Sequence, residues 1–384
     1  MKKILFLIDS LAVGGAEISV LEVIKNLQQC SSVVCVVYQG EHSLKAEFEA
    51  AGAKLYFLNI KKRFGFGEGV RELRKILKME KPNLVHTTLF KSEIIGRIAV
   101  PSSKIPLVGS LISDTYGKER YALVSRRERL KLNLYKLLNR ITAKRPDMYI
   151  SVSKSIIQPN LKYLGIKESK VKLIQNGRDV TVFEKARIYS KSEIIPDATS
   201  ESLLIITNSR VIRSKGFDEM LLAFQSLSKK FGNIFLVVAG NGFDFDFYKN
   251  MALEMGLDGK VVFLGRRHDI PSLLKSCDLF WFASHYEGSP GVVIEGMLSK
   301  TPMILSDIEP VLENIQDRRH ALIFKTGDAE DLAVKTEILI YDPEFGEKLA
   351  SAAYELGSNH FDIKKLVNKQ ETLYLELIQQ YENR

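Results

Sequence analysis

The feature that most constrains the fold is an alternation of short apolar segments with longer amphipathic ones, which runs through nearly the whole chain. Short apolar runs are typical of buried strands, and longer segments with a 3.6-residue period are typical of helices. In the first half we predict strands at Ile4–Ile8, Val33–Tyr38, Lys54–Leu58, Leu84–Thr87, Leu107–Leu111 and Met148–Val152. Helices are predicted between them at Glu17–Leu27, Ser43–Ala51, Gly67–Met79 and Lys91–Ala99. Such alternation predicts β-α-β units and a parallel sheet.

A second series of the same kind follows the polar stretch Ala186–Ser202. Its strands are predicted at Leu203–Thr207, Ile234–Ala239, Lys260–Leu264, Leu279–Ala283, Met303–Leu305 and Ala321–Phe324. Its helices are predicted at Phe217–Phe231, Phe245–Met255, Ile270–Lys275, Gly291–Lys300, Ala329–Leu339, Glu344–Leu356 and Ile363–Tyr381. We therefore expect two Rossmann-like halves separated by a cleft, and clefts between domains are favoured ligand sites.

The composition is that of a globular protein with room for two cores. The chain has 384 residues, of which 45% are hydrophobic and 26% charged. No apolar run approaches the ~20 residues of a membrane span, and the run at Ile4–Ile8 is too short for a secretion signal. Three scattered cysteines do not make a disulfide framework or a zinc site. We expect a cytoplasmic protein with reduced, mostly buried thiols.

The net charge of +9 is concentrated between residues 118 and 145, where ten Lys and Arg face two acids. The segment Tyr121–Arg140 also carries Leu130, Leu134, Leu137 and Leu138 at helical spacing, which predicts a basic amphipathic helix. Such a helix suits an anionic membrane surface or a lipid-linked acidic substrate. It equally suits a solvated helix whose leucines pack on the domain core. No recognisable nucleic-acid module accompanies the charge, so nucleic acid is not expected as a partner.

The segment Glu287-Gly-Ser-Pro-Gly-Val-Val-Ile-Glu295 follows a predicted buried strand and opens a helix. We predict Ser289 as the helix N-cap and Pro290 as the first helical residue. Ligands bind at the carboxyl ends of strands in open α/β sheets, and free helix-start amides suit a phosphate. Glu295 falls ~8 Å into the helix among apolar residues, so it needs a hydroxyl or a cation as partner. The alternative is an ordinary helix acid beside a solvated Glu287.

Other polar residues also follow predicted strands. Arg210 and Lys215 lie in the loop after Leu203–Thr207, where they could neutralise a diphosphate. Gly240-Asn241-Gly242 ends a later strand and suits close backbone approach, under a nucleobase or ribose. Gly14-Gly15 opens the first helix. The third glycine of the dinucleotide fingerprint does not follow this pair, which disfavours an NAD-dependent oxidoreductase.

Together these segments resemble glycosyltransferase family 4, the large retaining family with the GT-B fold of two facing Rossmann-like domains. The resemblance covers nearly the whole chain. It is carried by Gly14-Gly15-Ala16-Glu17, Gln175-Asn176-Gly177-Arg178-Asp179, Arg210 with Lys215-Gly216, Gly240-Asn241-Gly242, Gly265 with Asp269, and the E-x7-E pattern from Glu287 to Glu295. It implies an acceptor domain at 1–180, completed by a C-terminal helix that crosses back at 363–384, and a donor domain at 181–362.

The resemblance also implies residue roles. Glu287, Arg210 and Lys215 would form the catalytic group, with Glu287 at the donor sugar and the two cations at the departing diphosphate. Glu295 would bind the nucleotide ribose. The donor site implied in this way comprises Gly14, Gly15, Arg210, Lys215, Gly240, Asn241, Gly265, Pro290, Gly291, Val292 and Glu295. Neither a metal nor a cofactor is implied, and the substrate would be a UDP- or GDP-sugar.

One departure from the family lies in the first half. Many members carry a histidine after the strand that corresponds to Leu107–Leu111, and this chain has none there. His86, Ser113 and Asp114 are the candidates for the acceptor side.

The predicted function is transfer of a sugar from a nucleotide to a glycan or a polyprenyl-linked acceptor, in bacterial surface polysaccharide or glycolipid assembly. The enzyme would be cytoplasmic or peripheral on the inner membrane face. A sugar-nucleotide epimerase of the same fold and a non-catalytic nucleotide-sugar binding protein are the alternatives.

Overall fold

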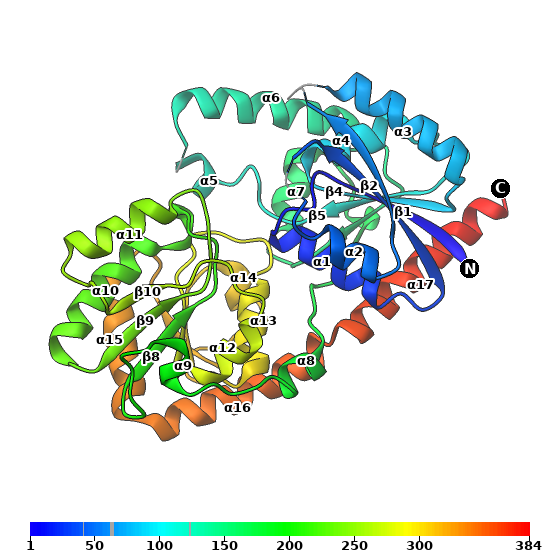
Figure 1. Ribbon diagram of the computed structural model, residues 1–384. Coiled ribbons are helices and arrows are strands. Elements are labelled where there is room, and N and C mark those ends of the chain that lie inside the picture. Colours follow the sequence, from blue (N-terminus) through cyan, green and yellow to red (C-terminus); the bar gives the residue numbers. More distant parts are fainter. Residues whose placement is uncertain (41, 62–64, 123) are drawn as a thin grey trace. The chain divides into compact units, whose positions relative to one another are not determined.

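The structure is a computed structural model that describes residues 1–40, 42–61, 65–122 and 124–384. The chain divides into two compact units. One unit comprises 1–177 together with 363–384, and the other comprises 178–362 (Figure 1). Each unit is built around its own parallel sheet.

The first unit contains a seven-stranded parallel sheet in the order β3-β2-β1-β4-β5-β6-β7. Its strands are β1 (Lys2–Ile8), β2 (Cys30–Tyr38), β3 (Lys54–Ile60), β4 (Leu84–Thr88), β5 (Leu107–Leu111), β6 (Met148–Ser151) and β7 (Val171–Leu173). The strand order reverses between β1 and β4, which makes the carboxyl ends of these two strands a natural ligand position. The edge strand β7 was not predicted, because three residues that include an exposed Lys172 carry no apolar run.

Helices cover both faces of this sheet (Figure 1). They are α1 (Gly15–Lys25), α2 (Lys45–Ala50), α3 (Phe66–Glu80), α4 (Phe90–Ala99), α5 (Lys118–Ala122), α6 (Arg126–Thr142), α7 (Ile157–Leu164), the 3-10 turn η1 (Glu168–Lys170) and α17 (Ile363–Glu382). The period of two along β1 separates the faces. Phe6 packs with residues of α1, α2 and α17, whereas Leu5 and Leu7 pack with residues of α3 and α4.

The second unit contains a six-stranded parallel sheet in the order β10-β9-β8-β11-β12-β13. Its strands are β8 (Leu203–Thr207), β9 (Ile234–Val238), β10 (Val261–Phe263), β11 (Leu279–Phe282), β12 (Met303–Ser306) and β13 (Leu322–Phe324). This is the 3-2-1-4-5-6 order of the Rossmann fold, and the order reverses between β8 and β11. The predicted α/β class with two Rossmann-like parallel sheets is therefore confirmed.

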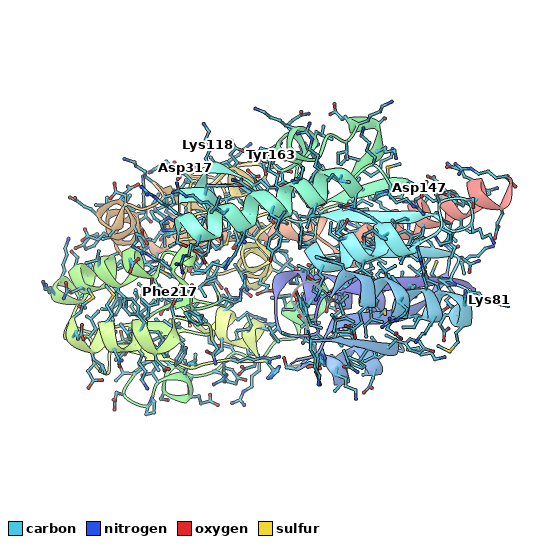
Figure 2. The ribbon with its side chains drawn as sticks, turned by 90° about the horizontal axis from the view of Figure 1, so that it is seen from above. Lys81, Lys118, Asp147, Tyr163, Phe217 and Asp317 are labelled. Atoms are coloured by element: carbon cyan, nitrogen blue, oxygen red, sulfur yellow. The ribbon has the colours of Figure 1, made fainter. Side chains whose placement is uncertain are left out.

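Helices also cover both faces of the second sheet. They are α8 (Val180–Glu184), α9 (Lys191–Ile194), the 3-10 turn η2 (Arg213–Lys215), α10 (Phe217–Lys230), α11 (Phe245–Glu254), α12 (Ile270–Ser276), α13 (Gly291–Ser299), α14 (Glu309–Leu312), α15 (Ala329–Tyr341) and α16 (Pro343–His360). Ile206 packs against the α13 side, and Ile205 packs against α10 and α15. Phe217, labelled in Figure 2, is fully buried at the start of α10.

The C-terminal helix α17 belongs to the first unit, as predicted. Buried Glu371 accepts hydrogen bonds from the backbone N–H groups of Gln29 at 2.7 Å and Cys30 at 2.8 Å. Near the end of the helix, the Tyr381 hydroxyl donates to Oδ1 of Asp147, the residue labelled in Figure 2, at 2.8 Å. These bonds attach α17 to the sheet of the first unit.

The prediction of one helix over Tyr121–Arg140 is wrong. The structure has α5 up to Ala122 and a new helix, α6, from Arg126, and residue 123 lies outside the described part of the chain. Ser125 interrupts the helical pattern because it is the N-cap of α6, where it forms a capping box with Glu128.

The interpretation that the four leucines of this segment pack on the domain core is wrong for three of them, and the fourth, Leu138, is half-buried. Leu130, Leu134 and Leu137 are 71%, 48% and 54% exposed, and Leu132 is the buried leucine of α6.

Among the described residues, no helix combines the length and the hydropathy of a transmembrane span. Cys30, Cys35 and Cys277 are free thiols in the interior, as expected for this chain. Burial raises the pKa of the Cys30 thiol to about 12, and it also raises the pKa of the other two.

Candidate active site

Apart from Gly265, which follows β10, the predicted site residues of the second unit lie at or after the carboxyl ends of β8, β9 and β11. These strands are neighbours in the sheet, and the reversal point lies between β8 and β11. The loop after β8 is joined to the loop after β11 by a hydrogen bond from the His285 N–H to the Ser214 carbonyl at 3.0 Å. The two loops therefore hold their side chains at one edge of the sheet.

Lys215 and Glu287 form an ion pair between these two loops, in which Lys215 Nζ donates to Glu287 Oε1. The side chains are 12% and 20% exposed, so the pair is partly shielded from solvent. Ser284 Oγ also donates to Glu287 Oε1 at 3.3 Å. Because Lys has three donors, Lys215 can hold Glu287 and still bind an anion.

Gly216 allows the close packing of the two loops. Its φ is +73°, and a Cβ at this position would lie 2.1 Å from the carbonyl oxygen of Ala283. Only glycine adopts that backbone conformation without strain and leaves the space free. This residue therefore determines how near Lys215 comes to Glu287.

A second pair of contacts holds Glu295 on α13. The Arg178 Nε donates to Glu295 Oε1 at 2.8 Å, and the Asn208 Nδ2 donates to Glu295 Oε2 at 2.7 Å. The prediction that Glu295 needs a hydroxyl or a cation as partner is confirmed by Arg178, and the Asn208 amide is a partner that was not predicted. A Cβ on Gly291 would lie 2.3 Å from a guanidinium nitrogen of Arg178, so this glycine lets the arginine lie across the start of α13.

Neither Arg178 nor Asn208 was assigned to the site from the sequence. Arg178 lies 117 residues before its partner, in the Gln175–Asp179 segment that was recognised only as a family pattern. The sequence signal for it was indirect, since a carboxylate on an apolar helix requires a cation without indicating which one.

The start of α13 differs by one residue from the prediction. Pro290, with φ −76° and ψ 92°, is the N-cap, and the helix begins at Gly291. Ser289 does not cap the helix because it lies one residue before the N-cap position, and the N-cap proline has no side-chain acceptor. The Val293 N–H donates to the Pro290 carbonyl at 3.0 Å. In the described part of the chain no backbone acceptor is found for the Gly291 and Val292 N–H groups, as is usual for the first N–H groups of a helix.

Arg210 is exposed on the loop after β8, and no ion pair within the described residues involves it.

The Gly240-Asn241-Gly242 loop, which follows β9, packs on the loop after β8. A Cβ on Gly240 would lie 2.0 Å from the Ser209 carbonyl oxygen, and the Val211 N–H donates to the Asn241 carbonyl at 3.1 Å. The close approach at Gly240 is therefore to protein backbone. Gly265 has φ +65° and open space around it.

His285 and Glu219 form another ion pair beside these loops, at 3.1 Å between His Nε2 and the carboxylate. The hydrogen bond to Glu219 raises the pKa of His285. Burial opposes ionisation of Glu219, but the hydrogen bond from His285 holds the pKa of that carboxyl below its usual value. The pair connects the Glu287 loop to α10, and it was not predicted.

The remaining candidates lie in the first unit. Gly14 is the N-cap of α1, where a Cβ would lie 2.4 Å from a carboxylate oxygen of Glu17, and Gly15 has open space around it. Ser113 Oγ lies 2.9 Å from Thr115 Oγ1. Asp114 accepts a backbone hydrogen bond from Gly117 at 3.2 Å.

His86 lies in the interior of the first unit. Its Nε2 lies 2.8 Å from Ser110 Oγ and its Nδ1 lies 2.6 Å from the Tyr374 hydroxyl of α17. Burial lowers the pKa of His86 to about 3, so the ring is neutral at pH 7. With both ring nitrogens engaged, His86 connects β4, β5 and the C-terminal helix.

Two family models cover most of the chain. Residues 13–182 match the model described as Glycosyltransferase Family 4, and residues 191–356 match the model described as Glycosyl transferases group 1.

The chain is also similar to characterised proteins. It is 25% identical over 316 residues to the UDP-Gal:alpha-D-GlcNAc-diphosphoundecaprenol alpha-1,3-galactosyltransferase of Escherichia coli, with 80% of this chain and 78% of that protein covered. It is 28% identical over 297 residues to the N,N'-diacetylbacillosaminyl-diphospho-undecaprenol alpha-1,3-N-acetylgalactosaminyltransferase of Campylobacter jejuni, with 73% of this chain and 74% of that protein covered.

Among solved structures, Anabaena HepE in complex with UDP-glucose superposes with a TM-score of 0.81 at 22% identity. The superposition covers 98% of this chain and 100% of HepE. At that identity the likeness concerns the fold alone.

Proposed function

This chain belongs to glycosyltransferase family 4, and from that premise we propose that it is a retaining, metal-independent enzyme. It transfers a hexose from a nucleoside-diphosphate sugar to a lipid-linked acceptor. The observation that carries the proposal is the set of contacts at the β8–β11 reversal, where Lys215, Glu287 and Glu295 lie beside an open helix start.

The donor diphosphate is bound by cations and helix amides. The Gly291 and Val292 N–H groups and the positive end of the α13 dipole meet phosphate oxygens. Lys215 and exposed Arg210 neutralise the charge that builds up on the departing nucleoside diphosphate, which is the electrostatic role that a divalent ion fills in other enzymes.

The two carboxylates bind the two sugars of the donor. Glu295 accepts hydrogen bonds from the ribose hydroxyls, and Arg178 and Asn208 hold it in place, since each carboxylate oxygen has a second lone pair available. Glu287 lies at the transferred hexose, positioned by Lys215 and Ser284. Gly240, Asn241 and Gly265 form the wall near the base.

The acceptor is a polyprenyl-diphosphate-linked glycan, bound by the first unit at the ends of its strands. Two relatives carry a diphosphoundecaprenol acceptor in their names, which supports this substrate class. Ser113 and Asp114, after β5, lie on the acceptor side. Such an acceptor places the enzyme peripherally on the cytoplasmic face of a membrane, in the assembly of a surface polysaccharide or glycolipid.

A thermal-shift screen over UDP-, GDP- and ADP-sugars identifies the donor, because a ligand that binds only the folded state raises Tm. We expect one nucleotide to stand out, and Glu295→Gln to reduce its effect. Absence of any shift across the panel would contradict the donor site.

The transfer itself is tested with the identified donor and short-chain polyprenyl-diphosphate glycans. We expect multiple-turnover release of nucleoside diphosphate only with acceptor, a product of the donor's anomeric configuration by NMR coupling constants, and no loss of rate in EDTA. An epimer formed from donor alone would show an epimerase instead, and nucleotide binding without turnover would show a binding protein.

A further inference from the structure

We infer that α6 is a docking surface for an anionic lipid bilayer, into which its exposed leucines insert. The inference rests on the proposed function, because a polyprenyl-linked acceptor is embedded in a bilayer. It concerns a different part of the molecule from the donor site.

The apolar part of this surface is a stripe along one side of the helix. Leu130, Leu134, Leu137 and Ile141 follow one another at intervals of four, three and four residues. At about 100° per residue they fall within about 60° of each other and extend over ~16 Å. They are 71%, 48%, 54% and 68% exposed. An exposed leucine stripe of this kind marks an interaction site.

Cations flank the leucine stripe on both sides. Arg127 and Lys131 lie on one side, and Arg126, Arg129 and Arg140 lie on the other, all about 50–110° from its centre by the same helical geometry. The helix has one acid, Glu128, which is engaged in the capping box with Ser125. None of these five cations forms an ion pair among the residues that the structure describes. The charge is therefore available to an anionic partner.

The orientation of α6 is set by contacts on its opposite side. Leu132 is buried, and Arg97 of α4 donates to Asn139 and, at 3.3 Å, to Thr142 Oγ1. The Lys136 ammonium lies 4.4 Å from the ring centre of Tyr163 of α7, the tyrosine labelled in Figure 2. These contacts hold the leucine stripe on the outer side of the helix.

The combination of groups favours a bilayer over other partners. An apolar stripe between cations is the pattern of a helix that lies in a membrane interface, with its leucines in the acyl region and its cations at the headgroups. Nucleic acid would engage the cations and leave the leucines exposed to water. Pairing of two copies through this face would bring two sets of arginines together.

The helix α3, which α4 separates from α6, adds positive charge to the same side of the unit. α3 packs on α4, which in turn packs on α6, and Figure 1 shows the three helices side by side. Arg71, Arg74, Lys75 and Lys78 line a shallow groove of about 320 Å³ along α3. Glu72 pairs with both Arg71 and Lys75 but offsets only one of the four positive charges, so these five side chains carry a net charge of +3.

Docking through α6 also serves the acceptor. Residues 112–125 connect the carboxyl end of β5 to the start of α6, and Ser113 and Asp114 lie in that connection. A bilayer in contact with α6 is thus adjacent to the chain segment that carries the acceptor-side candidates.

The test is co-sedimentation of the full-length protein with vesicles of phosphatidylglycerol and phosphatidylcholine, compared with vesicles of phosphatidylcholine alone. We expect binding to the anionic vesicles only. Leu134→Gln combined with Leu137→Gln should weaken it at least about tenfold, and Arg127→Gln or Lys131→Gln about fivefold each at low salt. The matched control is Leu222→Gln with Leu253→Gln, which changes leucines of similar exposure, 50% and 47%, on α10 and α11. It should leave binding unchanged.

Equal binding by the leucine variant and the control would overturn the inference, as would a failure to bind anionic vesicles. A dimer in sedimentation velocity that dissociates in the leucine variant would assign the stripe to a second copy. Binding of duplex DNA as tight as that of vesicles, and insensitive to the leucines, would assign the cations to nucleic acid. Thermal stabilisation by the nucleotide sugar is measured on the same variants. If it persists while vesicle binding is absent, the docking inference fails and the proposed function stands.

Discussion

Replacement of Gly216 by alanine tests how the loops after β8 and β11 are held together. The change has two effects in the structure. The backbone has φ +73°, which costs an L-residue about 1–2 kcal/mol. The new Cβ would also lie 2.1 Å from the Ala283 carbonyl oxygen and 2.7 Å from the Ala283 Cβ, both on a buried strand end. Forcing these groups apart costs a further 1–3 kcal/mol or so, as in an overpacked core.

Gly256→Ala is the matched control, because Gly256 has the same φ of +73° and nothing within 4 Å of its added Cβ. Alanine also lowers the entropy of the unfolded chain, by about 0.4–1 kcal/mol in either variant, so this effect cancels in the comparison. We expect Gly256→Ala to lose about 1 kcal/mol in urea unfolding and Gly216→Ala to lose about 2–4 kcal/mol.

The same two variants are then compared in turnover. Displacement of Ala283 from residue 216 separates Lys215 from Glu287, so Gly216→Ala should reduce kcat even at a temperature where it is fully folded. Gly256→Ala should keep the wild-type kcat. If the two variants lose equal stability, the packing of Gly216 on Ala283 does not contribute to the free energy of unfolding. The explanation that this packing brings Lys215 close to Glu287 would then be wrong.

Three further predictions concern charged contacts. Glu219 raises the pKa of His285 in the folded protein. The protonated imidazole therefore stabilises the fold fully below its unfolded-state pKa of ~6.5, and this contribution disappears as pH rises through the folded-state pKa. His285→Ala should reduce Tm more at pH 6 than at pH 9, and an equal loss at both would contradict the ion pair. Glu295→Ala breaks the contact with Arg178, whose side chain is 9% exposed. It should destabilise the second unit by about 3–5 kcal/mol in urea unfolding and also weaken donor binding. Glu295→Gln should recover most of the lost stability. Glu371→Ala leaves backbone donors of residues 28–30 without their buried acceptor. It should lower the free energy of unfolding by about 3 kcal/mol and speed amide hydrogen exchange in α17. Unchanged exchange in α17 would refute the role of Glu371 in holding the helix.

The elements of both sheets were predictable because their signals are local. Strands such as Ile4–Ile8 and Leu203–Thr207 are continuous apolar runs, and strands buried on both faces require such runs. Where the local signal was weak, prediction failed: β7 has three residues, and the break between α5 and α6 depends on a cap at Ser125 inside a segment whose periodicity continues on both sides.

The site was predictable to the extent that its residues lie at strand ends. Glu287, Glu295 and Lys215 all lie in or beside loops that follow strands, so their position at one edge of the sheet follows from the β-α-β pattern. Their partners did not follow from it. For each side chain, several residues far away in the sequence could be the contact partner. The sequence pattern does not indicate which of them the fold brings close.

The sequence by itself determined that this protein has two parallel sheets covered by helices. It also determined that loops with charged residues follow strands of the second unit. Both could be predicted because periodicity and residue type act over a few neighbouring residues. Only the tertiary structure decided that Arg178 and Asn208 hold Glu295 and that His86 binds the C-terminal helix. It also decided that Leu130, Leu134 and Leu137 of α6 are exposed. Those outcomes depend on which surfaces other segments cover. An amphipathic helix specifies that one side is apolar, and the packing of the rest of the chain decides which side is buried.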